Sequence, residues 1–481
     1  MKRRLFGILM AVALLIAPVG VFAQAGPFTV GFQVQNLSST QANISIQYVN
    51  GDGTTAATQN DTIPAGGSKT YFQTTMAAPV GFQGSVVISS DQPVAAIGNI
   101  VRSNFRAGGA YNGFSAGSTN LRLPIIQKNN SNINSFITFQ NAGTTDATVN
   151  VAYTPSSVGT AATDAGVVKP GAAITFRQDT KTQLGTTFIG SATVTSNVPV
   201  VAVVNQESNG TITNSTTGGL STYDSFAAGS ATVLLPLLMA NNSGFITGVG
   251  IQNAGTTVTN ITLTFSPNTY TGTNPAACPT PPAKVFSNIA VNGGVTSIQA
   301  GFADAQFATC RYIGGGTVTS SNGQQLVAVV NQLALGGSFS SSYEGFNDTA
   351  ATSVAQAPLV VSKNSGISSG IQVQNAGTSA TTAVISFSAN TFATAGGVTA
   401  CNTPSNITLT NIAASASRTI ILDKDLSGND PVVIAAGFNG CRYIGGATVT
   451  TSTGGRIVSI TNQLNVTGQG DQLLTYNLFN Q

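Results

Sequence analysis

One short stretch places acidic side chains at a spacing that metal chemistry could use. Asp423, Asp425, Ser427 and Asp430 lie within the sequence DKDLSGND. Asp-x-Asp-x-Ser-Gly is similar to the first half of a calcium-binding loop, in which alternate residues supply oxygen ligands and glycine permits the turn. Position twelve of such a loop is Ile434, so the closing bidentate carboxylate is missing. The stretch is an incomplete calcium motif, and the alternative interpretation is a solvated turn.

Few residues are available for other chemistry. The 481 residues include no histidine and 15 acidic residues. Without histidine, neither a Ser-His-Asp centre nor a His-ligated metal site can form. A pair of carboxylates for acid–base hydrolysis has one local candidate, the same DKDLSGND stretch. We therefore expect no enzymatic activity, and no cofactor unless the incomplete motif binds calcium.

The surface is expected to be neutral and rich in hydroxyl and amide groups. Charged residues make up 7% of the chain, against about 25% in an ordinary globular protein. At 42% hydrophobic residues the chain is not of the disordered class. The net charge of +3 corresponds to three cationic residues at the N-terminus, Lys2, Arg3 and Arg4. A neutral surface argues against nucleic acid as a partner and favours association.

The N-terminus has the pattern of an export signal. The cationic residues are followed by an apolar region from Leu5 to Ala17, then Pro18 and the small-x-small sequence Ala23-Gln24-Ala25. This pattern predicts a signal peptide over residues 1–25, cleaved on export, and an extracellular location. An uncleaved anchor is the alternative, but about 13 apolar residues fall short of the ~20 that span a bilayer. No membrane-spanning segment is expected after cleavage.

Three landmarks recur four times in the same order, which indicates four copies of one unit. The first is a strand that ends in Gln-Asn, at Asn36, Asn141, Asn253 and Asn375. The second is an apolar hairpin that reaches Asn99, Asn205, Asn331 and Asn462. The third is Tyr-x-x-Phe, at Tyr111/Phe114, Tyr223/Phe226, Tyr343/Phe346 and Tyr476/Phe479. The units are predicted to cover residues 26–117, 118–230, 231–352 and 353–481.

Within each unit the hydrophobic pattern has a period of two. Apolar runs of four to eight residues are bounded by Gly, Asn, Asp and Pro, which is typical of strands and turns. Seven or eight short strands in about 110 residues favour a β-sandwich of immunoglobulin-like type over a propeller blade of about 45 residues. The sequence therefore predicts an all-β protein of four tandem immunoglobulin-like β-sandwich domains, joined in a row by short connections.

Several of these motifs together resemble a known class of repeats. They are a Leu-Pro-like strand at Leu123-Pro124, Leu235-Pro236 and Ala357-Pro358, the hairpin Gly84–Val94, and the closing segment Tyr111–Ser118. The combination resembles the tandem immunoglobulin-like repeats of secreted surface proteins from Chloroflexota-type bacteria. The resemblance implies an extracellular structural or adhesive module with no established chemistry. The fourth unit departs from the pattern, with Gly454-Gly455-Arg456 where Pro-Val is expected.

Alignment of the units also pairs the cysteines. Cys310 and Cys441 each begin a CRYIGG sequence and are therefore equivalent. Cys278 and Cys401 precede them in the third and fourth units. We expect disulfides Cys278–Cys310 and Cys401–Cys441, which an exported protein can form. Free thiols are the alternative, and a four-cysteine metal site lacks the usual Cys-x-x-Cys spacing.

One end of the array is expected to be short by a strand. In units 2 to 4 the proline of the Leu-Pro-like segment stands at the same spacing before the Gln-Asn landmark, as Pro124 does before Asn141. In unit 1, Pro27 stands only half as far before Asn36. The first unit therefore lacks this strand, or, if the segment closes the preceding unit, the fourth unit is the incomplete one. An uncovered sheet edge can pair with another chain, and the alternative is an atypical capping unit.

These observations together favour a function without catalysis. The Tyr-x-x-Phe pairs could be sugar platforms, but one pair at the end of each unit is more simply explained by packing in the core or between domains. The expected protein is a secreted, non-enzymatic structural component of the bacterial cell surface or matrix that could self-assemble. The alternative is an adhesin or a carbohydrate-binding surface protein. Its expected partners are further copies of itself or other cell-surface components.

Overall fold

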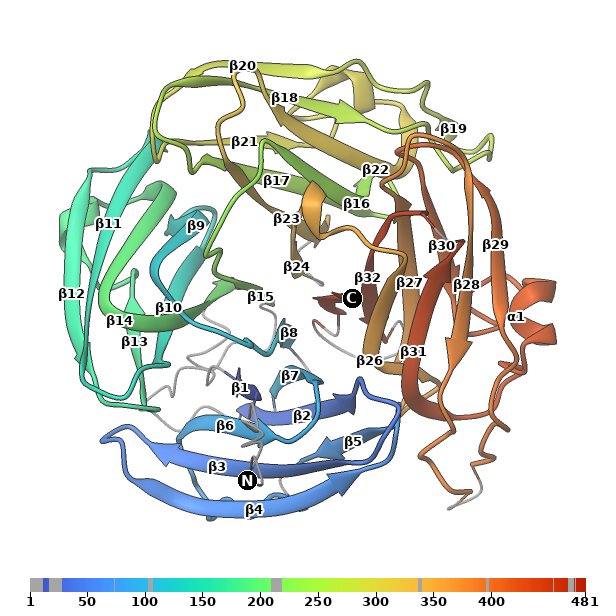
Figure 1. Ribbon diagram of the computed structural model, residues 1–481. Coiled ribbons are helices and arrows are strands. Elements are labelled where there is room, and N and C mark those ends of the chain that lie inside the picture. The colour runs from blue at the N-terminus through green and yellow to red at the C-terminus, as the bar shows by residue number, and fades with distance from the viewer. Residues whose placement is uncertain are drawn as a thin grey trace, which may run out of the picture.

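The computed structural model describes residues 12–16, 28–72, 74–102, 107–208, 219–335, 340–394, 398–452, 454–465, 471 and 473–481. Strands dominate all four units, so the all-β prediction is confirmed. The units are arranged around a ring, with one short strand of each unit near the centre (Figure 1). This arrangement differs from the expected row of separate domains.

Unit 1 consists of two four-stranded sheets with the orders β1-β6-β3-β4 and β5-β2-β7-β8. Its strands are β1 (Val12–Ile16), β2 (Phe28–Asn36), β3 (Ala42–Asn50), β4 (Thr55–Ile63), β5 (Ser68–Tyr71), β6 (Gly84–Ser90), β7 (Val94–Arg102) and β8 (Gly108–Asn112).

Unit 2 is built around one long strand, β14, which pairs with β9 and β11 through its first half and with β10 and β15 through its second half. Its elements are β9 (Ser118–Lys128), β10 (Ile133–Asn141), β11 (Ala147–Val158), β12 (Ala162–Val168), β13 (Ala173–Arg177), the 3-10 helix η1 (Thr182–Leu184), β14 (Phe188–Ser208) and β15 (Leu220–Asp224).

Unit 3 has one sheet with the order β20-β18-β22-β16-β25 and another with the order β21-β17-β23-β24, while β19 pairs with β22. Its elements are β16 (Thr232–Ala240), β17 (Phe245–Asn253), β18 (Thr259–Phe265), β19 (Ala276–Ala277), β20 (Lys284–Ile289), β21 (Gly294–Ile298), η3 (Ala305–Phe307), β22 (Cys310–Ser320), β23 (Leu326–Ala334), β24 (Ser340–Glu344), β25 (Phe346–Asn347) and η4 (Asp348–Ala350).

Unit 4 repeats this plan, with sheet orders β29-β28-β31-β26-β34 and β30-β27-β32-β33. Its elements are β26 (Val354–Ser362), β27 (Ser368–Asn375), β28 (Thr381–Phe387), β29 (Ile407–Ile412), β30 (Ser417–Ile421), the helix α1 (Pro431–Ala435), β31 (Tyr443–Thr451), β32 (Ile457–Leu464), β33 (Leu473–Asn477) and β34 (Phe479–Asn480).

The asparagine of the Gln-Asn landmark is explained by the turn that follows it. In unit 1, Asn36 Nδ2 donates to the carbonyls of Thr40 (2.6 Å) and Ile63 (3.1 Å), and its Oδ1 accepts from the Ser38 amide (2.9 Å). The side chain thus satisfies backbone groups that no strand partner reaches. Asn141, Asn253 and Asn375 make the corresponding bonds in their own units.

The ring is closed by apolar packing between successive units. Each unit has its own hydrophobic core, and each core includes side chains from the next unit around the ring. Val201, Val203 and Leu220 of unit 2 join the core of unit 1. Val329 of unit 3, Val458 and Ile460 of unit 4, and Ile97 and Ala110 of unit 1 join the cores of units 2, 3 and 4 respectively. The last contact brings the end of the chain back to its beginning.

Units 2 to 4 each begin with a strand that pairs with the edge of the second-landmark hairpin. These strands are β9, β16 and β26, here called the lead strands, and they pair with β14, β22 and β31. In unit 1 the corresponding position beside β6 is taken by β1. β1 lies inside the predicted export signal, upstream of the residues that were expected to form the unit. The part of unit 1 that follows residue 25 supplies no such strand among its described residues.

Candidate functional site

The most distinctive polar site lies at the centre of the ring. Each unit contributes the short strand that carries its Tyr-x-x-Phe tyrosine: β8, β15, β24 and β33 (Figure 1). Each of these strands pairs with its own unit and contacts the central strands of both neighbouring units. Side chains on the central strands and their pairing partners therefore face one another across the four seams between units.

A glutamine–asparagine pair joins the buried part of three seams. Gln206 of unit 2 and Asn331 of unit 3 exchange two hydrogen bonds of 3.1 Å. Gln332 of unit 3 and Asn462 of unit 4 exchange bonds of 3.0 and 2.9 Å. At the closing seam, Asn99 Nδ2 of unit 1 donates at 3.4 Å to the side-chain oxygen of unit 4's glutamine, Gln463.

The fourth seam, between units 1 and 2, breaks this pattern. The residue that follows the second-landmark asparagine is glutamine in units 2 to 4 but Ile100 in unit 1. Its counterpart across the seam is Asn205, which is fully buried and whose Oδ1 and Nδ2 both lack a partner among the described residues. A buried amide without partners costs free energy. This seam therefore lacks the glutamine–asparagine pair that the other three seams have.

A circle of hydrogen bonds surrounds two acidic side chains at the ends of the central strands. The backbone amide of Asn112 donates to Asp224 Oδ2 (3.0 Å), and the backbone amide of Asp224 donates to Glu344 Oε1 (2.5 Å). Asn477 Nδ2 donates to the Glu344 carbonyl (2.8 Å), and Asn112 Nδ2 donates to the Asn477 carbonyl (2.7 Å). One residue from each unit takes part, so the circle joins all four units.

The environment of these two carboxyl groups favours their protonated forms. Burial raises the pKa of Glu344 to about 7. Burial, together with the neighbouring Glu344 carboxylate, raises the pKa of Asp224 well above its usual value. Two negative charges so close together in a poorly solvated site repel each other, so the pair retains a proton near neutral pH.

A third carboxyl group, Asp471, joins the other ends of the central strands. It is 1% exposed, and its Oδ2 accepts from the Leu220 amide of unit 2 (2.9 Å) and from Ser340 Oγ of unit 3 (2.7 Å). Burial raises its pKa to about 8. Raised carboxyl pKa values also occur in catalytic acids. Here Oδ2 is bonded to a backbone amide and a hydroxyl of two other units, and Oδ1 accepts from the Leu473 amide of its own unit, an arrangement that holds strands together.

The tyrosines of the Tyr-x-x-Phe landmark are buried, and three of them bind the lead strand of their own unit. The hydroxyl of Tyr223 donates to the Ile125 carbonyl (2.6 Å), and that of Tyr343 donates to the Leu237 carbonyl (2.5 Å). Tyr476 donates to the Leu359 carbonyl in the same way. The accepting residue directly follows the lead-strand proline in each case.

The phenylalanines of the landmark lie at the edge of the lead strands. Phe226, Phe346 and Phe479 pair through their backbones with Arg122, Leu234 and Gln356, the lead-strand residues at equivalent positions. The expected packing role thus takes the form of contacts inside each unit. At the ends of the central strands, the residue that follows each tyrosine makes the contacts with neighbouring units. In unit 1, Tyr111 and Phe114 belong to the core, but the Tyr111 hydroxyl has no partner among the described residues.

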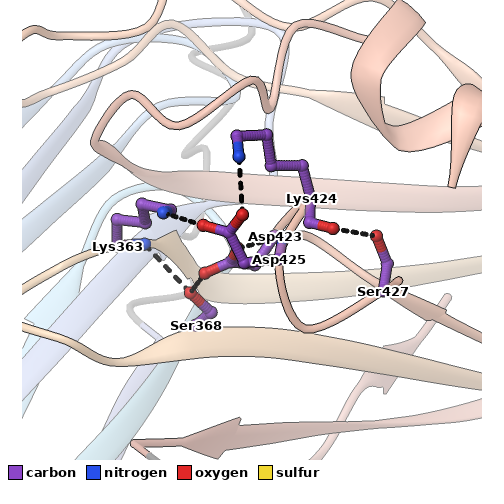
Figure 2. Close-up of polar contacts among 6 residues, drawn as sticks. All are labelled: Lys363, Ser368, Asp423, Lys424, Asp425 and Ser427. Atoms are coloured by element: carbon purple, nitrogen blue, oxygen red, sulfur yellow. Dashed lines mark hydrogen bonds and ion pairs between the residues drawn. The ribbon is translucent and has the colours of Figure 1, made fainter. Parts of the chain in front are cut away.

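The carboxylates of the incomplete calcium motif have partners within the protein (Figure 2). Asp423 is buried and accepts hydrogen bonds from Ser368 Oγ (2.7 Å) and from the Asp425 amide (2.9 Å). Asp425 lies between the ammonium groups of Lys363 and Lys424. Hydrogen bonds from these two lysines lower the pKa of Asp425 to about 2. Two lysine ammonium groups thus already pair with the exposed carboxylate of the motif.

The rest of the motif orders the turn and the helix that follows. Ser427 Oγ donates to the Lys424 carbonyl (3.2 Å). Asp430 Oδ1 accepts from the Val432 amide (2.9 Å) and so caps the N-terminus of α1. Within the described ranges, no three Cys, Asp or Glu side chains are grouped as a metal site would require. In the structure the motif forms a turn whose side chains bond to neighbouring groups of the protein.

Both disulfides predicted from the alignment are present. Cys278 is bonded to Cys310 at the start of β22, and Cys401 is bonded to Cys441 just before β31. The two bridges occupy equivalent positions in units 3 and 4. Each ties a long connection to a strand of the unit's larger sheet. Disulfides of this kind are compatible with an extracellular protein.

A groove of about 1060 Å³ lies at the closing seam between units 4 and 1. Unit 1 contributes Lys69 and the half-exposed Phe72, and unit 4 contributes Phe392 and Arg442. The Arg442 guanidinium lies 4.2 Å from the centre of the Phe392 ring. The groove therefore offers aromatic and cationic groups side by side, a combination that can contact a polar ligand.

The central site was missed in the sequence, although signals for it exist. Glutamine follows asparagine at the end of three otherwise apolar strands, at Gln206, Gln332 and Gln463, and polar residues in a buried strand need partners. Likewise, Asp224 and Glu344 follow a landmark tyrosine directly. Neither pattern shows that the partners come from different units, because that depends on closure of the ring.

Comparison with known proteins adds little. No family model matches the chain, and no curated protein matches it. The crystal structure of Thermotoga maritima 1070 is 18% identical over 23% of this chain and 94% of its own, with a TM-score of 0.20. A glycoside hydrolase of family 32 from Bifidobacterium adolescentis is 9% identical over 93% of this chain and 98% of its own, with a TM-score of 0.14. In the described part of the chain, no helix has the length and apolar character to cross a membrane.

Proposed function

We propose that the protein is a secreted, non-enzymatic structural component of the bacterial cell surface or extracellular matrix, built from four immunoglobulin-like sandwiches closed into one rigid ring. One observation carries the proposal: the buried polar side chains at the centre of the ring serve to join the units. The buried glutamines, asparagines and carboxyl groups at the centre bind other units.

The proposed localisation rests on two further features. The N-terminal charge and apolar pattern is that of an export signal. Two disulfides add covalent ties that persist outside the cytoplasm. A chain that is 7% charged also presents a surface with little electrostatic repulsion, which suits close packing against like surfaces.

The test is to locate the protein on the cells that produce it. Antibodies raised against the purified chain are applied to intact cells, and bound antibody is imaged by immunogold electron microscopy, with a cytoplasmic protein as the matched control. We expect continuous labelling of the cell surface or matrix and no labelling of the cytoplasmic control. Recovery of the protein from the cytoplasmic fraction, with unlabelled cell surfaces, would contradict the proposal.

A second candidate function is carbohydrate binding or adhesion, and the groove at the closing seam is the observation that favours it. Phe72 and Phe392 provide aromatic surface, and Lys69 and Arg442 provide donors. Aromatic residues with adjacent donors can hold a sugar or an extended polar ligand. In this function the same ring would support the groove. The two candidates differ only in whether the closing seam binds a ligand.

A further inference from the structure

The lead strand occupies a well-defined binding position in units 2 to 4. On one side its backbone pairs with the edge of the hairpin strand, for example β9 from Ser118 to Lys128 against β14. On the other side, the carbonyl after its proline accepts the hydrogen bond of a buried tyrosine, Tyr223 in unit 2. The position thus consists of a strand edge and one tyrosine hydroxyl, and the same two elements recur in units 3 and 4.

Unit 1 contains both elements of this position. The edge of β6 pairs with β1, in a register that sets Leu14 opposite Ile88 and Ile16 opposite Val86. The described part of β1 ends there, whereas β9 continues to residues opposite Phe188. Tyr111 is 2% exposed, and its hydroxyl has no partner in the parts of the chain that the structure describes.

The segment beside β6 lies within the predicted export signal. Pro18 stands before Asn36 at nearly the same spacing as each lead-strand proline before its Gln-Asn landmark, with a difference of a single position. The apolar stretch before Pro18 therefore has the pattern of an export signal and also stands where a lead strand is expected in the sequence of a unit. Cleavage after Ala25 would remove it, and β2 begins at Phe28. The processed unit 1 would then have an unpaired strand edge and an unsatisfied buried hydroxyl.

We propose that unit 1 of the exported chain is a strand acceptor, which binds an extended apolar segment of another polypeptide beside β6 in the position that β1 holds here. The inference rests on the export part of the proposed function, since the position is vacated by removal of the signal. An unpaired β edge presents amide and carbonyl groups that an added strand satisfies.

The three lead strands define the chemistry of the partner segment. The residues opposite Val194, Val318 and Val449, which are equivalent to Ile88, are Leu121, Val233 and Ala355. Two residues later stands Leu123, Leu235 or Ala357, followed by proline and then by the residue that accepts the tyrosine bond. The expected partner is therefore an antiparallel strand of the pattern apolar-x-apolar-Pro-apolar, in which x is a charged, apolar or polar residue, as Arg122, Leu234 and Gln356 show.

A second copy of this chain is a poor donor of such a strand. β9, β16 and β26 are each paired along their length within their own unit. A copy that donated one of them would have to open its own unit and expose another edge and another tyrosine. The partner is accordingly a different polypeptide that carries a free segment of this pattern.

The test uses a synthetic peptide with the sequence of β9, STNLRLPIIQK. The precursor is produced in an exporting host, and the mass of the purified protein establishes its N-terminus. Fluorescence anisotropy then measures binding of the labelled peptide and of a shuffled peptide of the same composition. We expect saturable binding of one peptide per chain and at least tenfold weaker binding of the shuffled peptide. Hydrogen exchange of residues 84–90 should slow about tenfold when the peptide is bound.

Matched variants assign the binding to this position. Tyr111→Phe removes the unsatisfied hydroxyl and should weaken peptide binding about fivefold, since one hydrogen bond is worth about 1 kcal/mol. Tyr223→Phe makes the same change in unit 2, where the lead strand is present, and should leave peptide binding unchanged. The unprocessed precursor, made without export, should bind the peptide at least tenfold less well than the exported chain.

Four results would overturn the inference, and the first three concern the exported chain by itself or with peptide. These three are equal binding of the lead and shuffled peptides, slow exchange of residues 84–90 in the exported chain without peptide, and a mass showing that the exported chain keeps residues 12–16. A dimer of the exported chain that the lead peptide dissociates would also contradict it, because the partner would then be a second copy. If the exported chain binds the peptide but does not label the cell surface, only the structural role fails. If it labels the surface and does not bind the peptide, only the acceptor fails.

Discussion

Replacing Gln332 by isoleucine is expected to lower the free energy of unfolding by about 2 to 3 kcal/mol. Gln332 is fully buried and bridges units 3 and 4, because its Nε2 donates to Asn462 Oδ1 (3.0 Å) and Thr475 Oγ1 (2.9 Å) and its Oε1 accepts from Asn462 Nδ2 (2.9 Å). The substitution leaves the partly buried Asn462 Nδ2 without the acceptor that Gln332 Oε1 provides. Urea unfolding followed by circular dichroism measures the effect.

The first unit provides a matched control in the opposite direction. Ile100 already stands at the equivalent position of unit 1, so the chain itself shows that isoleucine fits there. Ile100→Gln would give the unpartnered Asn205 side chain the pair that the other seams have, and we expect a gain of about 1 kcal/mol. If Ile100→Gln lowers the free energy of unfolding as much as Gln332→Ile does, the seams are not held by these pairs.

The second prediction concerns pH. The protein should lose roughly 5 kcal/mol of stability between pH 5.5 and 8.5. The pKa of Glu344 is raised to about 7 and that of Asp471 to about 8, while the pKa of Asp224 is raised well above its usual value. In the unfolded chain these groups are already ionised above about pH 5. Between about pH 5 and the folded pKa values, the folded state binds more protons than the unfolded state. Stability therefore falls as pH rises through the folded pKa values.

The composition makes this experiment clean. The chain has no histidine, and all four cysteines are in disulfides, so no other side-chain type ordinarily titrates in this range. Asp224→Asn removes one charge of the central pair and should flatten the pH dependence. Asp91→Asn is the matched control, because hydrogen bonds from Asn43 lower the pKa of this exposed carboxyl group and it stays ionised throughout. A wild-type stability that is constant or rises from pH 5.5 to 8.5 would contradict the assignment.

Local structure was largely predictable from the sequence. The Gln-Asn landmark, for instance, predicts a strand end at Asn253, and β17 ends at that residue. The cysteine pairs followed from the equivalence of Cys310 and Cys441, because an internal alignment compares residues in the same structural environment. Such predictions succeed because they depend on neighbours within a single unit.

The ring and its central site could not be predicted in the same way. Whether Gln463 meets Asn99 depends on the angle between successive units, and no local pattern encodes that angle. The calcium interpretation has the same limit, because it was based on local spacing alone. The motif around Asp423 has the right spacing, but Lys363, from a distant part of the sequence, lies against Asp425. Long-range partners decide the chemistry of both sites.

Closure of the ring is the central claim, and small-angle X-ray scattering of the purified exported chain tests it most directly. Four units closed around a common centre form a compact particle, for which the radius of gyration is expected to be about 23 to 26 Å. Four such units strung in a row, each about 35 Å across, would give about 40 Å or more. A radius of gyration in the compact range supports the closed ring, and one as large as that of the extended row would contradict it.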